Sequence, residues 1–401
     1  MNIRPPTRAA VSFILVTITL DALALGLVIP VLPKLVERMA GSTERAALIF
    51  GVFGTAWALM QFFFSPVLGA LSDRFGRRPV LLLSSLGLGL DYILMALAPD
   101  LVWLFVGRLI SGITAATFST AGAYIADVTP PEERAGRFGL IGAAFGIGFI
   151  IGPAIGGLLG TADPRLPFWV AAAASLANTA YGFFVLPESL PPEKRGAVSW
   201  QRASPMGALT LLRSDARLFR LSGAIFLYNL AHAVFPAVFV LHAGWRFGWG
   251  EGMVGLSLAA FGACTGIVQG ALVRPVVAHF GERATLLLGL IGGIAGFSML
   301  GLTSNETVFW LGMPVMALWG FIGPAAQGLM TRLVAPTEQG QLQGATASLM
   351  GVASLIGPGL FTMTFALGID AGRGAPLPGA PYLVAALLLA GSLAVAWRAT
   401  R

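Results

Sequence analysis

Apolar stretches of about 20 residues, the length that crosses a bilayer core as an α-helix, recur along the whole chain. Short segments between them hold most of the charged and turn-forming residues. The first apolar stretch is too long for a cleavable signal peptide, so we expect it to remain as a span. The pattern predicts an all-α membrane protein with twelve spans, at residues 9–33, 47–71, 79–98, 101–126, 136–160, 166–187, 218–242, 252–277, 284–302, 308–332, 342–367 and 379–397.

The longest polar break, residues 188–217, begins PESLPPEKRGAVSWQR and leaves six predicted spans on each side. It separates an N-terminal six-helix bundle, 1–187, from a C-terminal six-helix bundle, 218–401. With the N-terminus inside, 18 of the 25 Lys and Arg residues lie on cytoplasmic segments and six lie in outer loops. Positive residues favour the cytoplasmic side, so we expect both termini there. The net charge of +7 therefore reflects membrane orientation rather than nucleic-acid binding.

The two halves share short sequences at one spacing. RFGRRPVLLL at 74–83 matches HFGERATLLL at 279–288, and IGP at 151–153 matches IGP at 356–358; both offsets are 205 residues. Two matches at the same offset predict that the halves are structural copies. Parallel six-helix repeats are typical of transporters whose halves rock around a central site.

Charge is concentrated in the turn GALSDRFGRRPV, residues 69–80. Membrane orientation explains Arg74, Arg77 and Arg78, but not the acid Asp73 among them. We expect Asp73 to pair with an arginine of the turn or of a neighbouring helix and so to latch a gate. The glycines of the turn, Gly69 and Gly76, are expected to allow a tight bend and close helix approach.

This turn resembles the signature loop of the major facilitator superfamily, and three further stretches agree. LDALALGLVIPVLP at 20–33 is similar to the first-helix motif of the twelve-helix drug:proton antiporters, and LFVGRLISG at 104–112 is similar to their fourth-helix motif. The fifth predicted span resembles the antiporter motif of that group at Gly139, Gly148, Gly152, Pro153, Gly156 and Gly157. Those glycines also suit simple helix packing. The resemblance is closest to the tetracycline-efflux branch, and implies a bacterial inner-membrane exporter driven by protons.

Three charged residues lie deep within predicted spans: Asp21, Asp91 and Arg108. A charge at such depth costs about 3 kcal/mol on insertion scales, and usually marks an ion or substrate path. A carboxyl group in a cavity of low dielectric constant can exchange protons near neutral pH, so a proton and a drug can compete for it. We interpret the three residues as proton-coupling groups; the alternative is a structural ion pair between Asp21 and Arg108.

The predicted spans of the second half contain no Asp or Glu. The resemblance to tetracycline exporters implies an acid in helix 9 and a histidine in helix 8, where this chain has Gly293 and Thr265. That departure puts tetracycline itself in doubt as the substrate. Candidate substrate-binding residues are Gln61, Asn229, His232, Gln269 and Gln327, with Phe62, Phe63, Phe235 and Phe239 as candidates for an apolar wall.

Enzyme chemistry finds no support, because the chain lacks HExxH, GxSxG, GxxxxGK[ST] and any Cys/His cluster with metal spacing. The sequence therefore predicts proton-coupled efflux of a small lipophilic drug by a monomer in the lipid bilayer, without a resident cofactor or metal. An importer or uniporter of the same fold, and a receptor that does not transport, are the alternatives. The sequence leaves open whether Mg²⁺ accompanies the drug and which acid carries the proton.

Overall fold

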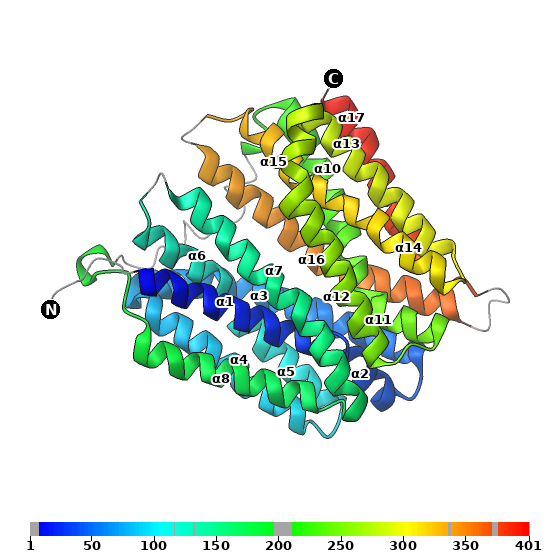
Figure 1. Cartoon of the computed structure of the whole chain (residues 1–401), viewed down its shortest axis with the longest axis horizontal. Coiled ribbons are helices and arrows are strands. Elements are labelled where there is room, and N and C mark those ends of the chain that lie inside the picture. Colours follow the sequence, from blue (N-terminus) through cyan, green and yellow to red (C-terminus); the bar gives the residue numbers. More distant parts are fainter. Residues whose placement is uncertain are drawn as a thin grey trace. The chain divides into compact units, whose positions relative to one another are not determined.

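The computed structural model describes residues 8–115, 117–130, 133–195, 211–335, 338–370 and 376–400. Residues 196–210 of the predicted inter-domain loop and the outer-loop residue Arg373 lie outside this part. Within it the structure is helical and has no β-strand (Figure 1).

The first-half helices are α1 (Arg8–Val28), α2 (Leu32–Ala40), α3 (Thr43–Phe75), α4 (Arg77–Leu97), α5 (Leu101–Thr114), α6 (Thr117–Val128), α7 (Arg134–Ala162), α8 (Leu166–Val185) and the short η2 (Pro192–Lys194). Those that follow are α10 (Ala216–His232), α11 (Val234–Phe247), α12 (Glu251–Ile267), η3 (Val268–Leu272), α13 (Val273–Leu302), α14 (Glu306–Ala317), η4 (Leu318–Phe321), α15 (Ile322–Thr331), α16 (Gln339–Ile369) and α17 (Ala380–Ala399).

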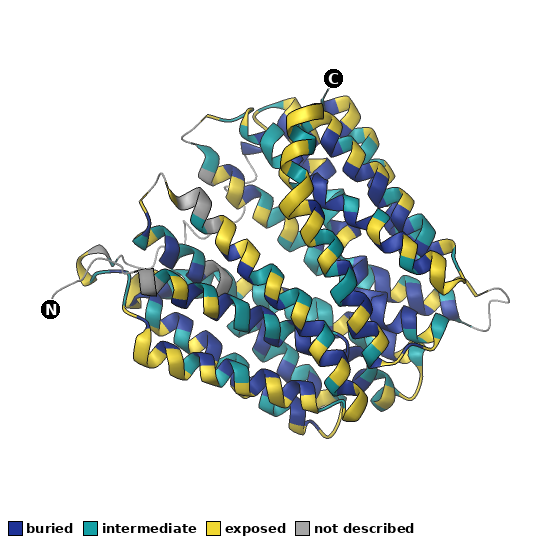
Figure 2. Ribbon diagram, in the orientation of Figure 1, coloured by how far each residue is buried: buried dark blue, intermediate teal, exposed yellow. Residues whose placement is uncertain are grey.

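Large apolar side chains are exposed on the outer faces of these helices, as a lipid environment allows. Phe184 is 83% exposed, Leu387 71% and Leu158 69%, and exposed positions recur along α7 and α8 in Figure 2. Inside a bilayer every backbone N–H and C=O needs an internal partner, which an α-helix provides. Among the described residues, ten helical segments are long and apolar enough to span a membrane. The chain is therefore a multi-pass helical membrane protein.

The count of twelve spans stays a prediction. The predicted spans 252–277 and 284–302 fall within one continuous apolar stretch, Glu251–Leu302. The predicted span 101–126 is divided between α5, which is a shorter apolar helix, and α6.

The internal repeat is visible in the backbone at two glycines. Gly76 has φ 105° and Gly281 has φ 77°, and both lie in the region that side chains with a Cβ rarely adopt. Gly76 separates α3 from α4, and Gly281 kinks α13 at the matching position, 205 residues later. Gly69 has no such role: it lies inside helix α3, and a Cβ built on it would meet nothing within 4 Å.

The described chain divides into two compact units. The first unit is Met1–Met39, Ala56–Ala203 and Gly250–Ala259; the second is Ala40–Thr55, Ser204–Trp249 and Ala260–Arg401. The predicted bundles, 1–187 and 218–401, coincide with these units except at residues 40–55 and 250–259. Each unit is described by itself below.

Glycines of α7 bring this helix into backbone contact with α1 in the first unit. A Cβ built on Gly152 would lie 2.7 Å from Cα of Gly26, and one on Gly148 or Gly156 would overlap backbone atoms of α1. Small residues four apart allow this approach in membranes, where van der Waals contact drives helix association. These three glycines therefore form a packing face of α7 against α1. Gly139 is not part of it, since no atom lies within 4 Å of its built Cβ.

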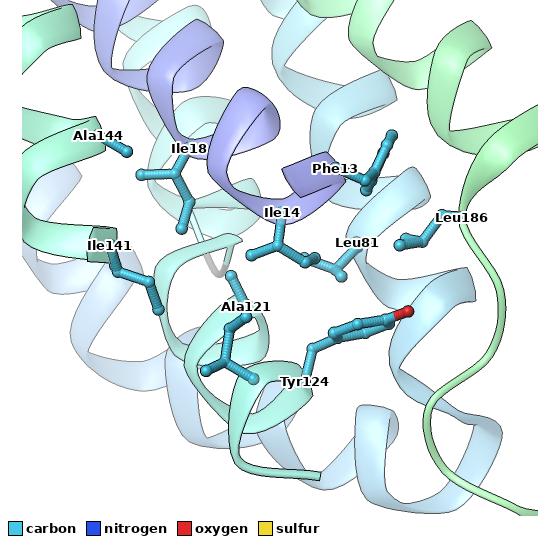
Figure 3. Packing of buried hydrophobic residues seen from close by; sticks show 10 residues of the cluster. Phe13, Ile14, Ile18, Leu81, Ala121, Tyr124, Ile141, Ala144 and Leu186 are labelled. Atoms are coloured by element: carbon cyan, nitrogen blue, oxygen red, sulfur yellow. The ribbon is translucent and has the colours of Figure 1, made fainter. Parts of the chain in front are cut away.

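A buried apolar cluster closes one end of the first unit. It joins Phe13, Ile14 and Ile18 of α1 to Leu81, Tyr124, Ile141 and Leu186, which come from α4, α6, α7 and the segment after α8 (Figure 3). Tyr124 has no exposed surface, and its hydroxyl donates a hydrogen bond to the Pro187 carbonyl at 3.0 Å. The cluster thus fixes the end of α6 and the start of the segment that follows α8.

The second unit is held by α10, α13 and α17. Ser392 Oγ of α17 donates a hydrogen bond to the Ala224 carbonyl of α10 at 2.8 Å. A Cβ on Gly301 of α13 would lie 3.0 Å from the Gly379 carbonyl oxygen. These contacts again rely on small residues at the helix interface.

Replacing Gly152 with alanine is expected to destabilise the first unit by about 1–3 kcal/mol, because the new methyl group has no room against Gly26. The loss would appear as a lower midpoint of thermal unfolding for purified protein in detergent. Gly142→Ala is the matched control on the same helix, where a Cβ meets nothing within 4 Å. Equal midpoints for the two variants would contradict the close contact.

Candidate functional site

Arg77 is the centre of an ionic cluster at the charged turn. Its Nε donates to Asp127 Oδ2 at 3.0 Å, and its Nη1 lies 2.5 Å from Asp73 Oδ1 and 2.7 Å from Ser72 Oγ. The Arg77 side chain is 11% exposed, Asp127 22% and Asp73 58%. The expected pair between Asp73 and an arginine of the turn is therefore present. The better shielded partner, however, is Asp127 of α6, which lies one turn beyond the anchored Tyr124.

Glu188 binds the backbone at the start of α4. Its Oε1 accepts the Arg77 N–H at 2.8 Å and the Leu190 N–H at 3.0 Å, while its Oε2 accepts the Arg78 N–H at 3.3 Å. A carboxylate suits this position, because the first N–H groups of a helix lack partners within the helix and carry partial positive charge. The glycine at 76 is needed here too, since a Cβ would overlap the Glu188 carboxylate.

The remaining arginines of the turn have other partners. Arg78 Nη2 donates to the Phe183 carbonyl of α8 at 2.5 Å. The Arg74 guanidinium lies over the Phe75 ring, 5.3 Å from its centroid. The turn is therefore tied to α6 and α8 of its own unit.

The second unit has an ion pair at the equivalent place, with the charges reversed. Arg332 Nη2 lies 2.9 Å from Glu282 Oε1. Residues 282 and 332 follow 77 and 127 by the same 205 residues that relate the sequence repeats. The position that is Arg in the first half is Glu in the second, and its partner changes from Asp to Arg. The attraction survives the exchange.

Asp21 lies on α1 in a buried polar contact with α8. Asn178 Nδ2 is 3.4 Å from Asp21 Oδ1, and Asn178 Oδ1 accepts a hydrogen bond from Thr17 at 3.1 Å. Asp21 is 9% exposed, and Thr17 and Asn178 are each 2% exposed. The carboxyl group thus faces polar partners within the first unit.

Asp91 of α4 lies beside Arg108 of α5. The two side chains interact electrostatically, and Asp91 is 1% exposed. A Cβ on Gly107 would lie 2.9 Å from Asp91 Oδ1, so this glycine lets the acid sit against α5. No hydrogen bond from the described residues reaches either carboxyl oxygen of Asp91.

The alternative interpretation paired Arg108 with Asp21, but the structure places Arg108 beside Asp91. Its electrostatic neighbours among the described residues are Asp91 and Tyr92, and its guanidinium lies over the Trp57 ring at 5.3 Å. Tyr92, which follows Asp91 on α4, interacts electrostatically with Asp21, Asp91 and Arg108. Arg108 therefore places its positive charge beside Asp91.

The candidate substrate residues other than Gln61 lie in the second unit. Asn229 and His232 are on α10, Gln269 is on η3 and Gln327 is on α15. His232 and Gln269 are exposed. Gln327 Nε2 is shielded, with no hydrogen-bond partner among the described residues. Gln61 is half-buried on α3 in the first unit.

The four candidate phenylalanines differ in exposure. Phe235 and Phe239 are buried and pack against each other with centroids 4.5 Å apart, so they belong to the core of the second unit. Phe63 is 57% exposed, and its ring contacts the half-buried Phe62 edge to face.

The two departures in the second half are also visible. Gly293 is buried in α13, and a Cβ there would lie 2.7 Å from Leu389 Cδ1. An acid at this position would therefore displace Leu389. Thr265 Oγ1 is shielded and has no hydrogen-bond partner in the described part of the chain.

Three residues of these sites were missed by the sequence analysis: Asp127, Glu188 and Asn178. Each had a signal, because Asp127 ends an apolar run, Glu188 belongs to the PESL stretch and Asn178 interrupts a predicted span. Within the described residues, no three His, Cys, Asp or Glu side chains come together as a metal site.

A helical membrane protein with repeated halves and buried charges is typical of a membrane transporter. A family model described as Major Facilitator Superfamily matches residues 14–358, and the chain belongs to that family. This membership indicates a transporter rather than an enzyme and confirms the resemblance found in the sequence.

Relatives place the chain with the tetracycline-resistance branch of the family. It is 41% identical over 360 residues to the class C tetracycline resistance protein of Escherichia coli, covering 89% of this chain and 90% of that protein. It is 38% identical over 373 residues to the class G protein of Vibrio anguillarum, covering 92% and 93%.

Solved structures share the fold. The human organic anion transporter MFSD10 (TETRAN) is 25% identical, with a TM-score of 0.73 over 98% of this chain and 100% of that one. The nucleoside transporter NupG has a TM-score of 0.74 at 13% identity, over 98% of each chain, and shows the fold alone.

Asp127→Asn is expected to destabilise the protein more than Asp73→Asn, although each removes one carboxylate from Arg77. Charged hydrogen bonds with limited exposure contribute about 1.5–3 kcal/mol. An exposed pair contributes about 1 kcal/mol or less. Thermal unfolding midpoints of the two purified variants test this order. A larger loss for Asp73→Asn would show that the exposed acid, not Asp127, holds Arg77.

A charge exchange tests the reversed ion pair of the second unit. Glu282→Arg alone places two arginines together and should lower the unfolding midpoint, and adding Arg332→Glu should restore most of the loss. The control is Glu282→Arg with Arg274→Glu, which has the same net charge but changes an exposed arginine elsewhere. Equal recovery in both double variants would mean that overall charge, not the pair, explains the effect.

Proposed function

We propose that this transporter is a proton-coupled antiporter that exports a small lipophilic, drug-like compound across the bacterial inner membrane. It acts as a monomer of twelve spans with both termini in the cytoplasm. The drug-resistance relatives support export, and the observation that carries proton coupling is Asp91. A buried polar group without a partner costs about 1–3 kcal/mol, and more when it is charged. Arg108 lies beside Asp91, but neither carboxyl oxygen of this acid has a hydrogen-bond partner among the described residues. The acid therefore costs stability at this position, and proton exchange gives a reason for keeping it.

Proton and drug compete in the proposed cycle. An ionised Asp91 or Asp21 carries a negative charge that attracts Arg108 and a bound drug, and protonation removes that charge. The drug therefore favours the ionised acid, whereas a bound proton favours release of the drug. Arg108 beside Asp91 favours the ionised acid until a proton arrives. Asn178 keeps the Asp21 carboxyl oriented in either state.

The charged turn serves as the gate in this proposal. Arg77, Asp73 and Asp127 hold the ends of α3, α4 and α6 together, and the Glu282–Arg332 pair does so in the second unit. Helices tied in this way can move as one body when the halves rock. The glycine contact between α1 and α7 seals that helix pair against proton leak.

The proposed substrate is a compound that does not depend on an acid in the second half. Leu389 occupies the space beside Gly293, and Thr265 is not a titrating group. We therefore expect weak tetracycline tolerance, in contrast to what the relatives' names describe. A Mg²⁺ ion, where a drug requires one, arrives bound to the drug.

The test is drug accumulation in everted membrane vesicles from a pump-deficient host, across a broad drug panel. Acidifying the lumen should drive uptake of at least one drug, and Asp21→Asn and Asp91→Asn should each abolish it. The variant that loses the proton carrier should keep drug-for-drug exchange, which needs no protonation. Glu44→Gln, at an exposed acid, is the control.

Uptake without a pH gradient would indicate a uniporter and contradict proton coupling. Proton-driven uptake that survives both substitutions would exclude the two acids as carriers. A large rise in tetracycline tolerance would contradict the expectation drawn from Gly293 and Thr265.

A further inference from the structure

The geometry points to an aromatic binding platform in the second unit, formed by His232 stacked on Trp319. The exposed face of the His232 imidazole takes a flat aromatic ring of the exported compound, and Gln269 binds polar groups at the edge of that ring. This inference rests on the proposed function and adds a substrate class and a new residue, Trp319, to it.

The two rings form a fixed stack. Their centroids are 4.3 Å apart and their planes differ by 19°. Trp319 is 3% exposed, whereas His232 is exposed, so the imidazole packs on the indole and keeps part of its own surface open. The Tyr228 ring meets the imidazole edge to face, with centroids 6.2 Å apart. Phe261 and Phe297 meet the Trp319 ring edge to face, with centroids 5.8 and 5.4 Å away. The indole is thus held from several sides and keeps the imidazole in one plane.

Two irregular helical turns bring the residues together. Trp319 lies on η4, a 3₁₀ turn, and Gln269 lies on η3, a π turn. A Cβ built on Gly320 would lie 3.1 Å from Gln269 Cγ and 3.5 Å from its Nε2, so Gln269 lies beside the residue that follows Trp319. Such interruptions of an α-helix often mark functional sites, because they redirect side chains from the regular spacing.

Polar groups without partners lie next to the stack. Phe261 and Thr265 are four residues apart on α12 and share one face of that helix. Phe261 meets the Trp319 ring, so Thr265 lies one helical turn from a residue that touches the stack, and Gln269 lies beside Gly320. Among the described residues, Thr265 Oγ1 has no hydrogen-bond partner, and the structure gives none for the exposed Gln269 amide.

This chemistry selects a flat aromatic compound with hydrogen-bonding groups on its edge. Rings stack favourably on an imidazole or indole face, and a few polar groups then fix the orientation. A positive charge is not required, because the spans of the second half contain no Asp or Glu. Core packing would explain the buried Trp319, but not an exposed histidine lying flat on it.

Paired substitutions distinguish the loss of an aromatic ring from the loss of side-chain volume. We would measure binding of tetracycline, acriflavine and the non-aromatic macrolide erythromycin to the purified full chain in detergent. Trp319→Phe and His232→Phe keep a ring, whereas Trp319→Leu and His232→Leu do not. Trp245→Leu and His279→Leu, at exposed positions away from the stack, are the matched controls.

The phenylalanine variants should bind the flat probes within about 3-fold of the wild type, and the leucine variants about 10-fold more weakly. If erythromycin binds to the wild type, the phenylalanine and leucine variants should bind it equally well. Equal loss in both series, or a wild type that binds neither flat probe, would overturn the platform. If the wild type exports a non-aromatic drug but binds neither flat probe, the export function stands and the platform fails. If no drug is exported but the ring series holds, the platform stands and the export function fails.

Discussion

Helices inside a bilayer gain little from hiding apolar surface, since lipid is as apolar as they are, so they depend on close contact between small residues and on polar pairs. The glycine contact between α7 and α1 is the clearest case in this protein. From α1 the packing continues to α8, then to α4, then to α5. Asp21, Asn178, Asp91 and Arg108 come from these four helices in turn. The buried charges therefore keep their places because the helices that bear them are packed without space to shift.

The two halves keep the same backbone turn with different side chains. A positive φ at Gly76 and Gly281 cannot be replaced cheaply, because any Cβ would be strained there. An ion pair is tolerant, since Arg77–Asp127 and Glu282–Arg332 keep N–O distances of 3.0 and 2.9 Å with the signs exchanged. Backbone geometry thus constrains the glycines more strictly than electrostatics constrains the charges.

Polar chemistry is divided unequally between the units. The first unit contains the buried acids Asp21 and Asp91 and the arginine, while the predicted spans of the second half contain no Asp or Glu. The second unit contains the stack of His232 on Trp319 instead, with Gln269 beside it. Under the proposed function, proton exchange belongs to one unit and recognition of the drug's ring to the other. Substitutions in the second unit could then change the substrate without altering the residues that carry protons.

Hydrophobic run length indicated the membrane class and marked Asp21, Asp91 and Arg108 as charges within spans. The charged turn and the motifs of the first, fourth and fifth spans indicated the family by their resemblance to it. These features depend on composition and local spacing, which the sequence carries directly. The sequence did not show which residues would become partners, because the partners lie apart in the chain. The structure pairs Arg77 with Asp127, Glu188 with the start of α4, Arg108 with Asp91, and His232 with Trp319. Which charges and rings meet depends on how helices rotate and pack against one another, and only the tertiary structure decides that.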